Sequence, residues 1–348
     1  MQINRQGIFV MFSIFVILFS SQLVLSQKVE SVYMSEFDSG ITIYTITNRP
    51  YEKSGEDVRF LNDVSSDTVL TFLKISFYQP DSLHITIMKQ EDFIRETSLL
   101  QDDWLLFVHG DSKTFEQAVM RGFDIQHLYN VHVLVFSWPS KDPEFNGIKN
   151  FKNSKQNVVR SLDHFTTLLH FVNKFKKSNP SFSESAKLSM FIHSLGNAYL
   201  ENLVKQHPPI NIKDTLFNNL IINAAAVNQE DHKLWVEQLN FQTHIYIINN
   251  KQDFNLKGVR IFTKDGKQLG EVIDQPVADN ANYVQFTEAV GFRTPTGTTH
   301  TYFIGEVADE SLNIRNFYKE IFHGQQPNLM NDSNFVKRED GVGFDINF

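Results

Sequence analysis

A serine stands between an apolar run and a glycine in the stretch SMFIHSLGN, residues 189–197. A nucleophilic serine is often carried on a sharp turn from strand to helix, where small neighbours let the backbone fold back and expose the hydroxyl. Ser194 has this context, because the apolar run LSMFIH precedes it and the helix-forming stretch LGNAYLENLV follows it. Gly196 matches the second glycine of the pattern G-x-S-x-G, but Ile192 replaces the first. The alternative role of Ser194 is a helix N-cap.

A base and an acid for this serine can be chosen from the downstream sequence. A serine hydroxyl is a poor nucleophile near neutral pH, so it needs an imidazole to accept its proton and a carboxylate to orient that imidazole. Asp253 follows a strand-like run in HIYIINNKQDFNL, and His300 lies in the Gly/Thr-rich stretch PTGTTHTYF. Taken alone, Asp253 could be a solvated loop acid and His300 a surface histidine. Because the three follow in the order serine, acid, histidine, we predict a triad. His193 is expected to pack at the end of its strand and project away from the site.

Acyl transfer through a serine also needs two backbone N–H groups aimed at the developing negative charge. Leu195, directly after the serine, should supply one. The second should come from Asp111, after LLFVHG, because Gly110 lets the backbone approach a substrate. The alternative for His109 and Gly110 is a plain strand-ending turn. The Asp111 carboxylate would weaken an oxyanion hole unless it points away.

Alternating short apolar runs and longer segments of helical period, from about residue 102, predict the elements that hold these residues. This alternation is typical of an α/β fold with a mostly parallel, doubly wound sheet. Expected strands cover residues 103–110, 131–136, 188–193, 216–226, 244–249 and 283–286. Expected helices follow a cap at Asp111 or Ser112, cover 195–205 and 311–322, and include a long one from Val158 to Phe175, ended by Asn179-Pro180.

The N-terminal part of the chain has a different pattern. Strand-like runs at 41–46, 69–77 and 83–88 are joined by short turns, which predicts antiparallel strands at an edge of the same sheet. The segment after residue 325 is polar and Asn-rich, and is expected to be loose. We therefore predict a single folded domain over residues 27–325 and a polar C-terminal tail over 326–348.

Residues 1–26 have the pattern of a secretory signal peptide. Arg5 precedes an apolar run from Ile8 to Leu25, and Val24 and Ser26 lie at the positions that favour cleavage before Gln27. An uncleaved membrane anchor is the alternative, since about 18 apolar residues can span a bilayer. No later stretch is long and apolar enough to span. We expect export to the periplasm or the exterior.

Composition narrows the function classes. Hydrophobic residues make up 41% of the 348 residues, enough for a buried core. The formal net charge is −8 and becomes more negative if Arg5 is removed with the leader, so nucleic acid is not expected as a partner. Cysteine is absent, which excludes disulfides and thiolate metal sites. No H-E-x-x-H or similar cluster is present, so we expect neither a metal nor a cofactor.

Six stretches of the sequence, in order, together resemble one known family. They are TITNRP at 45–50, LLFVHGDSKTFEQAVMR at 105–121, VLVFSWPS at 133–140, FIHSLGN at 191–197, IYIINNKQDFNL at 245–256 and GTTHTYF at 297–303. Over about residues 40–322 the chain is similar to the α/β-hydrolase family catalogued as domain of unknown function 900. This resemblance implies a serine-hydrolase fold with Ser194, Asp253 and His300 at the triad positions and no established substrate.

The sequence departs from the family in two places. The residue after His-Gly is usually aromatic in the family, and here it is Asp111. Many relatives carry an aspartate after the strand that is LIINAAAV here, where this chain has Ala225, Ala226 and Val227. The second departure leaves Asp253 as a stronger candidate acid than Asp231.

The predicted function is that of a secreted serine hydrolase cleaving a carboxylic ester, or an amide, through an acyl-enzyme on Ser194. One alternative is a catalytically silent hydrolase fold that binds a partner, suggested by Ile192 and Asp111. Another is an acyltransferase that uses the same triad. The substrate is expected to be a small-molecule or lipid-like ester, shaped by the loops at 141–154 and 255–297. The sequence predicts neither the substrate's identity nor the oligomeric state.

Overall fold

The computed structural model describes residues 41–348 except 56, 79–81, 207–211, 213 and 292–296. The predicted leader therefore lies outside the described residues, and export stays a prediction. In the part of the chain that is described, no helix combines the length and apolar character needed to cross a bilayer. The described part of the chain divides into two compact units: residues 43–74 with 86–348 form the first, and the described residues outside these ranges belong to the second. All candidate site residues belong to the first unit.

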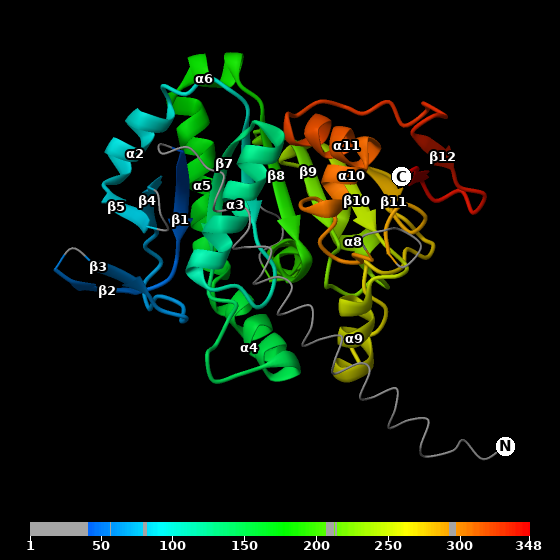
Figure 1. The fold of residues 1–348 in the computed structure, drawn as a ribbon, viewed down its shortest axis with the longest axis horizontal. Coiled ribbons are helices and arrows are strands. Elements are labelled where there is room, and N and C mark those ends of the chain that lie inside the picture. Colours follow the sequence, from blue (N-terminus) through cyan, green and yellow to red (C-terminus); the bar gives the residue numbers. More distant parts are fainter. Residues whose placement is uncertain (1–40, 56, 79–81, 207–211, 213, 292–296) are drawn as a thin grey trace. The chain divides into compact units, whose positions relative to one another are not determined.

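The central sheet is mostly parallel, as predicted, and is coloured along the chain in Figure 1. Its strand order is β12-β13-β11-β10-β9-β8-β6-β7-β1-β4-β5. Strands β6, β7, β8, β9, β10 and β11 are joined by parallel pairings, and their side chains are largely buried because helices cover such a sheet on both faces. The bounds are β1 Thr42–Thr47, β4 Thr71–Tyr78, β5 Ser82–Met88, β6 Trp104–Val108, β7 His132–Ser137, β8 Leu188–His193, β9 Phe217–Asn223, β10 Gln242–Asn249, β11 Ala281–Gln285, β12 Phe335–Lys337 and β13 Phe344–Ile346.

Two pairs of strands are antiparallel in the described part of the chain for which the direction of pairing is given. Near the N-terminus, β2 (Tyr51–Ser54) pairs in antiparallel fashion with β3 (Asp57–Phe60) in a separate two-stranded sheet. β12 and β13 are also antiparallel. β1, which we expected in the antiparallel edge, instead runs parallel to β7, with Tyr44 opposite Leu134.

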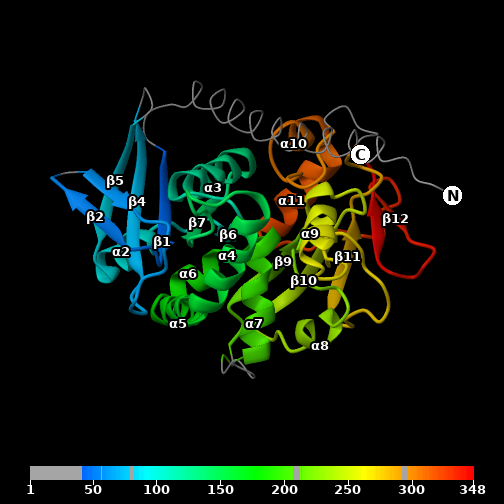
Figure 2. The ribbon, with the colours of Figure 1, turned by 90° about the horizontal axis from the view of Figure 1, so that it is seen from below.

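Helices cover both faces of the sheet, as Figure 2 shows for the first unit. Helices α3, α10 and α11 lie on one face, and α5, α7 and α8 lie on the other. The described helices are α2 Gln90–Thr97, α3 Phe115–Tyr129, α4 Gly147–Arg160, α5 Leu162–Ser178, α6 Pro180–Ser185, η2 Ser194–Asn197, α7 Ala198–Gln206, α8 His232–Val236, α9 Phe254–Thr263, α10 Glu306–Glu310 and α11 Leu312–Phe322.

Two helix boundaries differ from the predictions. The N-cap of α3 is Thr114 rather than Asp111 or Ser112, because Thr114 and Gln117 form a reciprocal capping box that fixes the first turn. The long helix expected from residue 158 to 175 is divided at Ser161, where α4 ends and α5 begins. α4 thus covers much of the predicted 141–154 loop.

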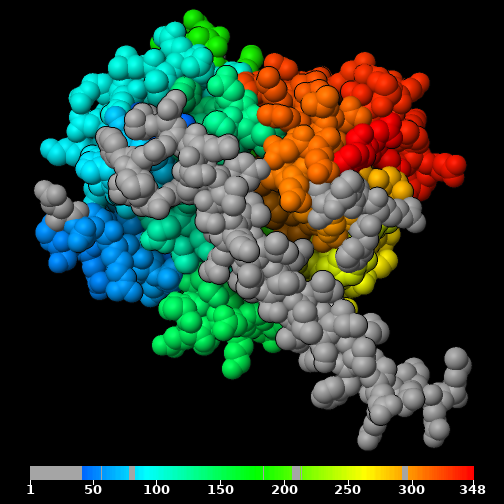
Figure 3. Space-filling view, in the orientation of Figure 1, coloured from blue at the N-terminus to red at the C-terminus, as the bar shows by residue number. Residues whose placement is uncertain are grey.

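The predicted loose tail over residues 326–348 is wrong. β13 pairs in parallel with β11, and β12 pairs with β13, so the tail extends the sheet. Phe335 and Ile346 are buried, which supplies the apolar contact that the polar composition concealed. In Figure 3 the C-terminal residues, in red, lie against the orange residues of α10 and α11.

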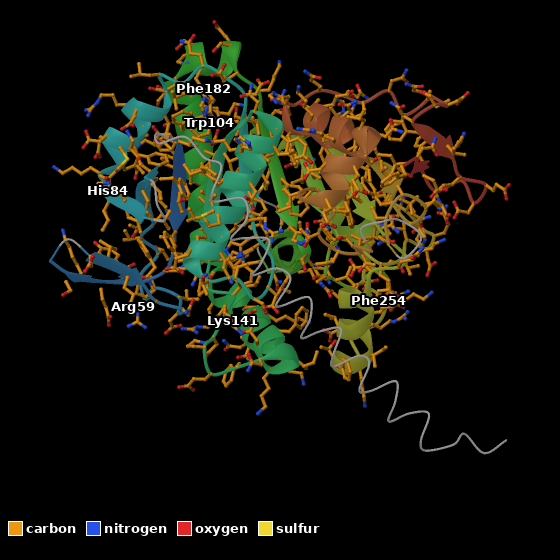
Figure 4. The ribbon with its side chains drawn as sticks, viewed as in Figure 1. Arg59, His84, Trp104, Lys141, Phe182 and Phe254 are labelled. Carbon is orange, nitrogen blue, oxygen red and sulfur yellow. The ribbon has the colours of Figure 1, made fainter. Side chains whose placement is uncertain are left out.

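The carboxyl ends of the parallel strands lie at one edge of the sheet. In Figure 4, Trp104 at the start of β6 lies at the upper end, whereas Lys141 after β7 and Phe254 after β10 lie at the lower end. Open α/β sheets place their functional residues along the edge formed by the carboxyl ends. Ser194 and Asp253 each follow a strand at that edge.

Candidate active site

Ser194 occupies a strained turn as the first residue of η2, directly after β8. Its φ is +54°, a left-handed conformation that costs a non-glycine residue on the order of 1–2 kcal/mol. The amide of Asn197 stabilises the turn by donating to three carbonyl oxygens: Ile192 at 3.1 Å, Ser194 at 3.0 Å and Asn223 at 3.3 Å. The sequence-predicted turn is therefore present, although Ile192 replaces the first glycine and is fully buried.

Two glycines allow the ends of β6 and β8 to touch at this turn. A Cβ atom on Gly110 would lie 2.7 Å from Ser194 Cβ and 3.3 Å from Ser194 Oγ. A Cβ atom on Gly196 would lie 2.7 Å from the carbonyl oxygen of His109. Both separations need a hydrogen in place of a side chain. The loop that carries Asp111 is thereby held beside the Ser194 hydroxyl.

Asp253 and His300 are hydrogen-bonded. His300 Nδ1 lies 2.6 Å from Asp253 Oδ2, which joins an imidazole after β11 to a carboxylate after β10. Asp253 is fully buried, and the His300 side chain is 13% exposed. The second carboxylate oxygen, Asp253 Oδ1, accepts the backbone N–H of Leu256 at 3.0 Å and caps α9. Asp253 thus orients a histidine and begins a helix with the same side chain.

The loop that carries His300 is anchored on both sides of the histidine. Asn250 Nδ2 donates to the carbonyl oxygen of Thr299 at 2.8 Å, and the hydroxyl of Tyr129 donates to the carbonyl oxygen of Phe303 at 2.5 Å. Asn250 also accepts the backbone N–H of Gln252, so it connects the two loops that bring Asp253 and His300 together. These anchors come from the residue after β10 and from α3, far from His300 in the sequence.

The ring of His193 faces the site rather than away from it. Its centroid lies 4.7 Å from that of His300, so the expectation that His193 projects elsewhere is wrong. His300 therefore lies at the end of β8, where Ser194 is the next residue. The structure gives no hydrogen bond between these two described side chains, Ser194 and His300. Such bonds are often long in free enzymes and shorten only when substrate is bound.

His109 fixes the peptide that carries the predicted second oxyanion donor. The backbone N–H of Trp138 donates to His109 Nε2 at 3.1 Å, so the ring proton lies on Nδ1 and donates to the carbonyl oxygen of Gly110 at 2.9 Å. In a trans peptide the N–H points opposite to the C=O. The N–H of Asp111 is therefore turned away from His109. The rings of His109 and Trp138 are stacked, at 5.4 Å, which supports this orientation.

The Asp111 carboxylate is directed toward α4. Its Oδ1 accepts from the side-chain amide of Asn150 at 2.9 Å, and its Oδ2 accepts from the hydroxyl of Ser112 at 3.1 Å. Burial raises the pKa of this carboxyl, while hydrogen bonds from Ser154 and Ser112 oppose that rise. The other predicted donor, the N–H of Leu195, lies in the first turn of η2, where backbone N–H groups have no partner within the helix.

A buried arginine, Arg49, supports the loops that follow β6 and β7. The sequence does not predict this role. The Arg49 guanidinium donates to the carbonyl oxygens of Lys113 at 3.0 Å and Trp138 at 2.5 Å, and to the side chain of Asn62 at 2.7 Å. Burial lowers the pKa of Arg49 to about 9. The stretch TITNRP contains this residue, but nothing in its pattern shows that the cation turns inward.

We expect folding stability to fall in acid because His109 is held neutral. Burial lowers the pKa of His109 to about 3 from its usual 6.5. Between these two pH values the unfolded chain binds a proton at His109 that the native chain does not. The stabilising contribution of neutral His109 to the free energy of unfolding is therefore complete above pH 6.5 and is lost as the pH falls toward 3. The slope per histidine is about 1.4 kcal/mol per pH unit. The free energy of unfolding, measured with urea from pH 7 to 4, should depend less steeply on pH for His109→Asn than for wild type, by the equivalent of about one proton. Equal slopes would contradict this assignment.

The residues the structure describes contain no group of three or more histidine, aspartate or glutamate side chains placed to hold a metal ion. Comparison with protein families gives a match over more than half of the chain. The family described as alpha/beta hydrolase of unknown function (DUF900) matches residues 87–304, which include Ser194, Asp253 and His300. No curated protein matches the chain.

Proposed function

This chain belongs to the α/β-hydrolase family of unknown function, and from that premise we propose that it is a serine hydrolase acting on carboxylic esters through Ser194, His300 and Asp253. The single observation that carries the proposal is the 2.6 Å hydrogen bond between His300 Nδ1 and the buried Asp253 carboxylate. This bond places the imidazole proton on Nδ1. It leaves Nε2 as the atom that can accept a proton.

The strained turn at Ser194 also supports the proposal. Strain at a non-glycine residue persists only where the surrounding contacts hold it, and it is concentrated at functional sites. Here Asn197 and the two close-packed glycines hold Ser194 in the left-handed region. A serine that served only to cap a helix would not need this conformation, because N-cap residues are typically extended.

The proposed reaction proceeds in two proton-balanced steps. Ser194 Oγ attacks the ester carbonyl as its proton passes to His300 Nε2, and the oxyanion accepts hydrogen bonds from the N–H groups of Leu195 and Asp111. The intermediate collapses, and the leaving alkoxide takes the proton from Nε2. Water then attacks the acyl-enzyme as its proton passes to His300 Nε2, and collapse of this second intermediate releases the acid while the proton returns to Ser194 Oγ. Asp253 stays ionised throughout and stabilises the transient imidazolium.

A fluorophosphonate probe tests this proposal directly. We expect one phosphonyl adduct on folded wild-type protein, located by peptide mapping on the segment that contains Ser194, and no adduct on Ser194→Ala or on heat-unfolded wild type. The unfolded sample is informative because it keeps every serine but loses the Asp253–His300 pair. Failure of well-folded wild type to react would favour a catalytically silent binding protein instead.

A further inference from the structure

Another histidine, His193, lies beside His300 in the proposed site but has no part in the proposed reaction. It ends β8, and its ring contacts two rings of the loop after β11: His300 at 4.7 Å between centroids, and Phe303 at 5.0 Å. The contact with Phe303 is edge-on, at 64°, and that with His300 is tilted, at 50°. The ring of the proposed base thus packs against another imidazole.

The proton of His193 is positioned by two residues from other elements. Asn223, at the end of β9, donates from Nδ2 to His193 Nδ1 at 3.1 Å, and the hydroxyl of Tyr318, from α11, donates to Asn223 Oδ1 at 2.6 Å. If the Asn223 amide were turned over, its Nδ2 would donate to the Tyr318 hydroxyl oxygen, and the Tyr318 hydroxyl proton would no longer have Asn223 Oδ1 as its acceptor. Nδ1 is therefore the acceptor, and the neutral ring carries its proton on Nε2.

The surroundings of His193 also oppose a positive charge on it. Burial lowers the pKa of His193 well below the usual value, and the nearby His300, Arg121 of α3, Lys113 and His109 lower it further. No carboxylate contacts either ring nitrogen of His193 in the described part of the chain. Asp253 is bonded to His300 instead. Among the described residues, His300 therefore has a carboxylate partner and His193 has none.

We propose that His193 is a positioning residue of the site, a neutral imidazole held with its proton on Nε2 by Asn223 and Tyr318, against which the ring of His300 packs. This proposal rests on the proposed function. A neutral neighbour limits the rotation of the His300 ring without repelling the imidazolium that forms when Ser194 gives up its proton. A positively charged neighbour would destabilise that imidazolium.

Replacing one atom of Asn223 tests the proposal. Asn223→Asp puts a carboxylate against His193 Nδ1, which favours a proton there and charges the ring, with the positive end of the new ion pair toward His300. We expect the acid limb of the pH profile of kcat/KM to move down by about one unit. Asn223→Ala, which removes the hydrogen bond without adding charge, should leave the acid limb in place and lower kcat. Equal profiles for the two folded variants would overturn the proposal.

A measurement on the wild-type protein does not depend on activity. In nitrogen-15 spectra of histidine-labelled protein at pH 7, with His193 assigned by difference against His193→Gln, Nε2 should be protonated and Nδ1 should not. A proton on Nδ1 would overturn the proposal. If wild type neither reacts with the fluorophosphonate nor turns over any ester, the proposed function fails, and this spectrum alone then decides how His193 is held.

Discussion

Ser194→Ala should reduce ester turnover by roughly three orders of magnitude or more, to the level left by the oxyanion donors and substrate binding alone. Removing the Oγ atom eliminates the covalent step but leaves the backbone N–H groups of Leu195 and Asp111 unchanged. The loss should therefore appear in kcat, with little change in KM. Initial rates with a series of short-chain p-nitrophenyl esters measure both constants.

The matched control for this variant is Ser189→Ala. Ser189 is fully buried on the same strand, β8, and its hydroxyl has no hydrogen-bond partner among the described residues. Its removal should leave kcat within about twofold of wild type, because it deletes no interaction at the sheet edge. A similar loss in both variants would show that activity responds to disturbance of β8 rather than to the Ser194 hydroxyl.

The backbone conformation at Ser194 also predicts the folding stability of the Ser194→Ala variant. Alanine at φ +54° meets the same steric cost as serine, so Ser194→Ala should keep the wild-type stability to within about 0.5 kcal/mol. The side-chain amide of Asn197 donates only to backbone carbonyl oxygens, so these hydrogen bonds do not depend on the Ser194 hydroxyl. An unchanged unfolding midpoint would separate the loss of activity from any loss of fold.

Local sequence patterns identify the candidate site residues, but they do not reveal the contacts that support these residues. Ser194, Asp253 and His300 each follow a recognisable strand or a Gly/Thr-rich stretch, and parallel strands necessarily bring such ends to one edge. The prediction of a mostly parallel sheet is confirmed, since the hydrophobic runs of β6 to β10 are buried on both faces. Patterns of this kind depend only on neighbouring residues, which is why the sequence reveals them.

The supporting contacts depend on residues that are far apart in the chain. Arg49 reaches Trp138 and His109 accepts from the same residue, but neither pairing has a periodic signal. The C-terminal strands were missed for a similar reason. β12 and β13 are only three residues long and lie in a polar stretch of the chain, and their pairing is decided by the edge of β11 rather than by the composition of that stretch.

Asp253→Asn should lower kcat by about 10⁴ while keeping most of the folding stability. The amide oxygen can continue to accept the N–H of Leu256 and cap α9, because asparagine is as good an N-cap as aspartate. The amide nitrogen then faces His300 Nδ1 and donates to it. This donation moves the imidazole proton to Nε2, so the atom that should accept the Ser194 proton is already occupied.

Asp253→Ala separates the two functions of this carboxylate. It should lose comparable activity but also unfold at a lower denaturant concentration, because the helix cap, typically worth about 1 kcal/mol, disappears with the oxygen. Urea unfolding and ester turnover, measured on both variants, give a direct comparison. If Asp253→Asn kept wild-type turnover at its full stability, the Asp253–His300 bond would be a structural contact, and the proton would have to leave Ser194 by another route.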